Sequence, residues 1–210
     1  MKMIILIGPQ GSGNHLFSKI FSMHDDVHGW KALLEPDGYF IPHEKEPSNA
    51  YWNDPSKIDQ SIMGGKEFAV TSISSTYMVN YKPHIPPLFQ FTEQLTKHEI
   101  EYEVVAIGRD RNILDLQQRR VRGGPTWGIM PLLIRNFEKP PFFVSQELLY
   151  LYRQNYLRSL AAWLDFPIAW NDPRVEHILA NDANAKYVQP CERTELDDYV
   201  NNYNKPTWLK

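Results

Sequence analysis

The sequence is poor in cysteine and in long apolar runs. Cys191 is the only cysteine among the 210 residues, which excludes a disulfide within the chain and a cysteine-based zinc site. A reducing compartment is consistent with this usage. The apolar run Ile4 to Ile7 is too short for a secretory signal, and no stretch reaches the roughly 18 apolar residues of a membrane span. We therefore expect a soluble, cytoplasmic protein that does not associate with membranes.

An excess of positive charge is also missing. Lys and Arg total 22 and Asp and Glu total 25, for a formal net charge of −3. No global basic field would attract nucleic acid or anionic lipid, so any anion site must be local. Hydrophobic residues make up 42% of the chain, enough for a sizeable core. We expect one domain spanning residues 1–210.

Buried strands alternate with amphipathic helices along the chain. Strands are expected at 3–7, 67–73, 102–107 and 141–144. Helices are expected after residue 13, at 86–98, after residue 110 and from Ser145 to Phe166, with one or two short helices after Asp172. Ser145 is expected to cap its helix, and Leu148, Leu149, Tyr152, Tyr156, Leu160, Ala161 and Leu164 to form the buried face. This order predicts a three-layer α/β fold with a parallel sheet, whose ligands bind at the carboxyl ends of the strands. The irregular region at about 24–62 is interpreted as a lid or insertion.

A glycine-rich turn follows the first expected strand. Its glycines, Gly8, Gly11 and Gly13, permit close approach to the backbone N–H groups at a helix N-terminus, which favours an anion such as phosphate. The glycine spacing matches the ATPase P-loop, but Asn14 and His15 replace the Lys and the Ser or Thr of that motif. An ordinary Mg-ATP hydrolase is therefore not favoured. The alternative is a purely structural turn.

Arginine follows the third expected strand. Arg109 ends that strand and would point into the ligand crevice, where its planar fork suits phosphate oxygens. A plain surface pair with Asp110 is the alternative. Arg119, Arg120 and Arg122 are assigned to a solvated helix face. No metal ligands occur at recognisable spacing.

Together the two loops resemble those of the sulfotransferase family, which has a P-loop-like fold and binds the sulfate donor 3′-phosphoadenylyl sulfate (PAPS). The family's first loop follows a G-x-P-R-S-G-T-T-L pattern, and residues 8–16 read G-P-Q-G-S-G-N-H-L. The family's second loop has Arg followed by Asp or Asn and a Ser eight positions on, and here Arg109-Asp110 is followed by Gln117. Residues 143–149 and 157–167 are similar to a later strand and helix end of the family. Gly11 stands where the family commonly has Arg or Lys.

The resemblance implies the P-loop NTPase-like, sulfotransferase-like form of the α/β fold and a site for PAPS or its product adenosine 3′,5′-bisphosphate. The residues implied to bind this cofactor are Gly8, Gly11, Ser12, Gly13, Asn14, His15, Arg109 and Gln117. Glu35, which precedes Pro36, is the implied general base, with His43 as the alternative, and His15 would supply part of the missing loop charge. Lys186 or Arg193 could add basic contacts.

Three functions follow as hypotheses. The first is a PAPS-dependent sulfotransferase that moves a sulfuryl group to a hydroxyl or amine of an unidentified small-molecule or peptide acceptor. The second is a P-loop nucleotide kinase or NTPase with an altered Walker motif. The third is a non-catalytic, nucleotide-binding protein with a sulfotransferase-like fold.

Overall fold

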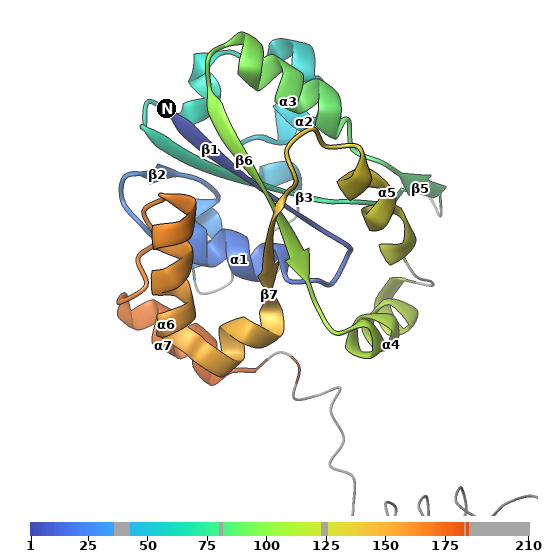
Figure 1. Cartoon of the computed structure of the whole chain (residues 1–210), viewed down its shortest axis with the longest axis vertical. Helices are drawn as coiled ribbons and strands as arrows, with labels where there is room; N and C mark the ends of the chain where they lie inside the picture. Colours follow the sequence, from blue (N-terminus) through green and yellow to red (C-terminus); the bar gives the residue numbers. More distant parts are fainter. Residues whose placement is uncertain (36–42, 80–81, 123–125, 183, 185–210) are drawn as a thin grey trace, which may run out of the picture.

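A five-stranded parallel sheet forms the centre of the molecule in a computed structural model (Figure 1). The model describes residues 1–35, 43–79, 82–122, 126–182 and 184. The strands are β1 (Lys2–Gly8), β2 (Val27–His28), β3 (Phe68–Ser74), β6 (Glu101–Gly108) and β7 (Phe142–Ser145). Their order across the sheet is β2-β3-β1-β6-β7, and every neighbouring pair is parallel.

Apolar side chains cover both faces of β1, the central strand. Met3, Ile5 and Ile7 pack on one side, whereas Ile4 and Leu6 pack on the other. All five side chains are fully buried. A continuous apolar run of this kind is what a parallel strand covered on both faces requires.

Helices cover the two faces of the sheet. The Ile4 and Leu6 side packs against α1 (Asn14–Phe21), α6 (Gln146–Leu164) and α7 (Pro173–Ala180). The opposite side packs against α2 (Asn49–Asn53), α3 (Leu88–Lys97) and α5 (Met130–Arg135). This arrangement confirms an α/β fold with a parallel sheet between two helical layers.

Part of the region predicted to be a lid or insertion packs into the core. Its described residues form β2 of the central sheet, α2 and the short 3-10 helices η1 (Lys31–Leu34), η3 (His43–Lys45), η4 (Pro55–Lys57) and η5 (Gln60–Met63). Trp30, Trp52 and Ile62 from this region are at most 4% exposed. Residues 36–42 lie outside the described part. The remaining elements are the hairpin β4 (Tyr77–Val79) and β5 (Lys82–His84), η6 (Trp127–Ile129) and α4 (Arg111–Arg122).

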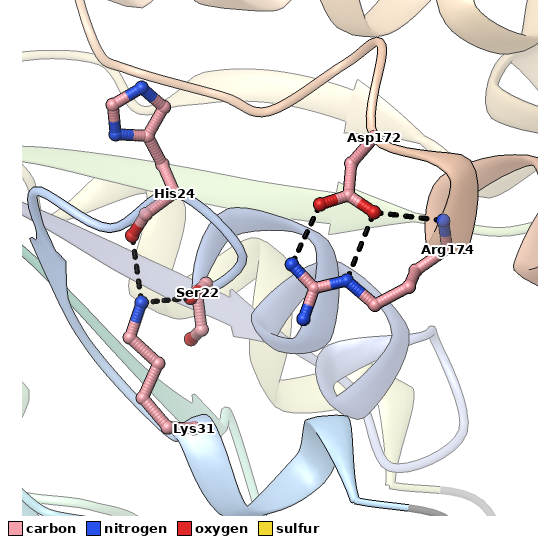
Figure 2. A network of polar contacts seen from close by, with 5 residues as sticks. All are labelled: Ser22, His24, Lys31, Asp172 and Arg174. Carbon is pink, nitrogen blue, oxygen red and sulfur yellow. Dashed lines mark hydrogen bonds and ion pairs between the residues drawn. The ribbon is translucent and has the colours of Figure 1, made fainter.

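A lysine secures the carboxyl end of α1. The Nζ atom of Lys31 donates hydrogen bonds to the carbonyl oxygens of Ser22, at 2.6 Å, and His24, at 2.7 Å (Figure 2). These carbonyls lie at and just beyond the helix end, where a cation is favourable. Asp172 is the N-cap of α7. Its carboxylate accepts hydrogen bonds from the backbone N–H and the guanidinium of Arg174 (Figure 2).

A kink divides α6, where Arg153 has a φ of 52°. The predicted buried face of this helix is wrong at two positions, since Leu148 is 39% exposed and Tyr152 is 57% exposed. The other predicted positions are buried or pack against the core. Although α6 has 19 residues, no helix in the described part of the chain is long and apolar enough to cross a membrane.

Candidate functional site

The strand order creates a switch point between β1 and β6. The connection from β1 leads through α1 to β2 on one side of the sheet, whereas the connection from β6 leads through α4 and α5 to β7 on the other. Ligands of open α/β sheets bind outside the carboxyl ends of strands at such a point. The β1–α1 loop, residues 8–13, follows the carboxyl end of β1, and Arg109 follows the carboxyl end of the neighbouring β6.

Two glycines give the β1–α1 loop its shape. Gly11 has a φ of 88°, and Gly13, the N-cap of α1, has a φ of 112°. The N–H of Ser12 closes a turn on the carbonyl of Pro9 at 3.0 Å. The first helical hydrogen bond runs from Phe17 to the carbonyl of Gly13 at 2.9 Å. The N–H groups of residues 14–16 precede that bond and therefore have no acceptor within the helix.

Asn14 braces the loop from the inside. Its Nδ2 atom lies 3.3 Å from the carbonyl oxygen of Gly8 and 3.3 Å from the hydroxyl of Ser74, at the end of the neighbouring β3. Its Oδ1 accepts from the hydroxyl of Ser12 at 3.3 Å. Both side chains are buried, so these two predicted ligand residues would meet an anion through the backbone. Their side chains hold the loop to the sheet.

Arg109 reaches from the end of β6 to the β1–α1 loop. Its Nη1 donates to the carbonyl oxygen of Gly11 and to Oε1 of Gln117. Its Nη2 and Nε donate to Oδ1 of Asn184 at 2.7 and 3.1 Å. The guanidinium, the loop and Gln117 thus converge, as the sequence predicts. These acceptors are neutral carbonyl oxygens, and an anionic oxygen would form a stronger bond to the same group.

The imidazoles of His15 and His43 meet at the start of α1. Their Nε2 atoms are 2.9 Å apart, so one Nε2 carries a proton and the other accepts it. The ring of Trp30, which is 1% exposed, lies 5.0 Å from His15 and 5.2 Å from His43 between centroids. The pair therefore carries at least one shared proton beside an apolar wall, next to the loop.

Glu35, the implied general base, lies just before residues 36–42, which are outside the described part of the chain. Glu35 is exposed and lies at the end of η1, where its N–H bonds to the carbonyl of Ala32 at 3.3 Å. Lys186 and Arg193 lie outside the described residues. Among the residues that the structure describes, no three His, Cys, Asp or Glu side chains are grouped closely enough to hold a metal ion.

Glu46, a residue that the sequence analysis did not select, is a buried acid near the His43 turn. It is 4% exposed, and its Oε1 accepts a 2.8 Å hydrogen bond from the hydroxyl of Thr71 in β3. Thr71 in turn accepts from Nε1 of Trp52 at 2.9 Å. Burial raises the pKa of Glu46 to about 7, although Thr71 and the nearby backbone amides of Ser48 and Ser72 partly oppose the shift. No local sequence signal distinguishes this glutamate from an exposed one.

Further glutamines surround the loop. Gln118 donates from Nε2 to the carbonyl of Gln10 at 2.6 Å. Gln146, the first residue of α6, is 2% exposed. Its Oε1 is buried, accepts no hydrogen bond from any described residue, and lies 3.1 Å from where a Cβ on Gly13 would be. Tertiary packing alone brings these side chains to the loop, so their sequence positions carry no signal.

Comparison with known proteins adds no family assignment: neither the scan against family models nor the search of curated proteins finds a match to this chain.

Proposed function

We propose that this protein is a PAPS-dependent sulfotransferase that acts on a hydroxyl or amine of a small-molecule or peptide acceptor. The observation that carries the proposal is the convergence of Arg109 and the β1–α1 loop at the switch point of the sheet. A helix N-terminus and a guanidinium that meet at the carboxyl ends of β1 and β6 suit a ligand with two phosphate groups.

The residues at the carboxyl ends of β1 and β6 have chemistry that fits the donor. The backbone N–H groups at the start of α1 would hold the phosphate that bears the sulfate, and Arg109 with Gln117 would hold the 3′-phosphate. In binding, the guanidinium would exchange neutral carbonyl partners for anionic oxygens, which form the stronger charge-assisted bonds. Positioning and electrostatics would supply most of the acceleration.

Bound PAPS would supply a sulfuryl group: its bond to the 5′-phosphate oxygen would break as the acceptor oxygen or nitrogen bonds to sulfur, with adenosine 3′,5′-bisphosphate as the leaving group. The acceptor loses a proton in this step, and the His15–His43 pair is placed beside the loop to take it. With one proton already shared between the two rings, the neutral pair has capacity for one more. We therefore assign the role of general base to this pair in preference to Glu35.

Binding of adenosine 3′,5′-bisphosphate tests the proposal. At a concentration about 100 times its Kd, the ligand should stabilise the protein by about 2.7 kcal/mol, measured by thermal unfolding. Arg109→Lys keeps the charge but removes the planar fork, and it should weaken binding about tenfold or more. Arg158→Lys, an exposed substitution on α6, serves as the control.

The other ligands separate the alternatives. Stabilisation by ATP with Mg²⁺ and none by the bisphosphate would contradict the proposal and favour an NTPase. Bisphosphate binding without any release of sulfate from PAPS, in the presence of acceptor mixtures or water, would favour a non-catalytic nucleotide-binding protein.

A further inference from the structure

The turn that carries His43 is fastened to the sheet at Glu46. The backbone N–H of Glu46 bonds to the carbonyl of His43 at 3.0 Å, so the two residues close one turn of η3. The carboxyl group of the same residue accepts from Thr71 in the middle of β3. Glu46 therefore links the backbone of His43 to a strand of the central sheet, because its N–H bonds to His43 and its side chain bonds to Thr71.

A second attachment converges on the same threonine. Trp52, at the end of the segment 43–53, donates from Nε1 to Thr71. Its indole also stacks on Phe91 of α3, with the ring centroids 3.8 Å apart and the planes at 12°. The segment is thus held at two points, and a continuous chain of donors runs from Trp52 through Thr71 to Glu46. Hydrogen bonds in such a chain polarise and strengthen one another.

The edge of the sheet explains why this segment needs a side-chain attachment. Strand β2 pairs with β3 only at Phe68 and Ala69. Beyond these residues, the turn of Glu46 lies beside β3, with its carboxyl near the backbone amide of Ser72. Because β2 is so short, the side chain of Glu46 attaches this segment to β3, where a longer strand would attach it through backbone hydrogen bonds.

We propose that Glu46 is a positioning residue that holds His43 against His15. The carboxyl group of Glu46 fixes the η3 turn to β3. The position of this turn determines where the His43 ring contacts His15 in the first turn of α1. The 2.9 Å separation of the two Nε2 atoms leaves little room for displacement, since a hydrogen bond weakens steeply beyond about 3.2 Å. The inference rests on the proposed function to the extent that the pair is its general base.

The charge state of Glu46 is compatible with this role. A neutral carboxyl is less costly to bury than a carboxylate, and the raised pKa follows from burial. Within the described part of the chain, no charged side chain contributes to that shift. On the same turn, Glu44 and Lys45 are exposed. The attachment therefore depends on an acceptor oxygen at this position, which glutamine also provides.

Histidine titration in the full-length protein tests the inference directly. In protein labelled with 15N at histidine, the ring nitrogens of His15 and His43 should titrate as one coupled pair, because their Nε2 atoms share a hydrogen bond. In Glu46→Ala the two rings should titrate independently. Glu46→Gln should preserve the coupled pair, and Glu44→Gln, which removes a negative charge from the same turn, is the matched control.

Thr71→Val covers the case in which Glu46→Ala fails to fold. It removes the hydroxyl from the β3 side and should uncouple the histidines in the same way. Coupled titration that persists in a folded Glu46→Ala or Thr71→Val protein would overturn the inference. So would uncoupling in Glu46→Gln equal to that in Glu46→Ala, or independent titration in the unmodified protein.

Bisphosphate binding keeps this inference separate from the proposed function. Glu46→Ala should retain the affinity of the unmodified protein for adenosine 3′,5′-bisphosphate, because the contacts of Arg109 with Gly11 and Gln117 do not involve Glu46. If the unmodified protein does not bind the bisphosphate, the proposed function fails, whereas the histidine titration still decides the role of Glu46.

Discussion

Replacement of the buried acid Glu46 by glutamine should stabilise the protein in a pH-dependent way. Burial raises the pKa of Glu46 from the ordinary value of 4.5 to about 7 in the folded state. The folded protein therefore binds this proton more tightly than the unfolded chain. The free energy of unfolding contributed by Glu46 is fully present below pH 4.5, falls as the pH rises, and is lost above about pH 7. Glutamine stays neutral throughout and removes this loss.

The size of the effect follows from the two pKa values. A displacement from 4.5 to about 7, at about 1.36 kcal/mol for each pH unit, corresponds to about 3 kcal/mol. Glu46→Gln should therefore match the unmodified protein near pH 4.5 and exceed its free energy of unfolding by about 3 kcal/mol near pH 8. Glutamine retains an acceptor oxygen for Thr71, so the hydrogen bond should survive.

Urea unfolding of both proteins, followed by tryptophan fluorescence between about pH 4.5 and pH 8.5, measures this difference. The comparison must be a difference curve because other groups titrate in the same window. Burial beside Lys31, for example, lowers the pKa of His28, which makes its own contribution rise with pH. Glu44→Gln, at an exposed position, should give a flat difference. A flat curve for Glu46→Gln as well would refute the assignment of a buried neutral acid.

Four further substitutions, of which Gly65→Ala is a comparison for Gly13→Ala, test the local structure by chemical denaturation. Gly13→Ala should cost about 1–3 kcal/mol, because its φ is 112° and the new Cβ would lie 3.1 Å from Oε1 of Gln146. Gly65→Ala, with a φ of 71° but open space around it, should cost less, and equal costs would argue against crowding at the loop. Ser145→Ala removes the N-cap hydrogen bonds of α6 and should cost about 1 kcal/mol; no change would argue against the cap. Trp52→Phe keeps an aromatic ring but loses the hydrogen bond to β3 and should cost about 1–3 kcal/mol; a neutral result would contradict the double attachment.

Features with a local physical cause could be predicted from the sequence. The apolar run of β1 and the capping hydroxyl of Ser145 both act on their own neighbourhood, and the structure confirms both. The kink at Arg153 and the two-residue strand β2 could not be predicted in this way. Neither feature corresponds to a periodic pattern in the sequence around it, because the packing of distant elements determines where the kink and the strand form.

The candidate site divides along the same line. Gly13 and Arg109 follow buried strands, and the carboxyl ends of parallel strands meet at one edge, so their proximity follows from topology. The sequence analysis selects both His15 and His43, but their pairing depends on the path of the chain between these residues, which are 28 positions apart. Glu46 carries no motif at all. Its importance becomes visible only when its burial and its contact with Thr71 are known.

Strand β3 connects the two halves of the proposed site. At its carboxyl end, Ser74 bonds to Asn14 and so fixes the first turn of α1, which carries His15. In its middle, Thr71 bonds to Glu46 and so fixes the turn that carries His43. The two histidines come from segments far apart in the chain. The segments that carry them are nevertheless attached to the same strand, at Thr71 and Ser74, which are three residues apart. A site that shares a proton needs its partners held to a few tenths of an ångström. A rigid, buried strand keeps the separation of the two rings constant better than a direct contact between two loops would, because a displacement of the strand would move both rings together.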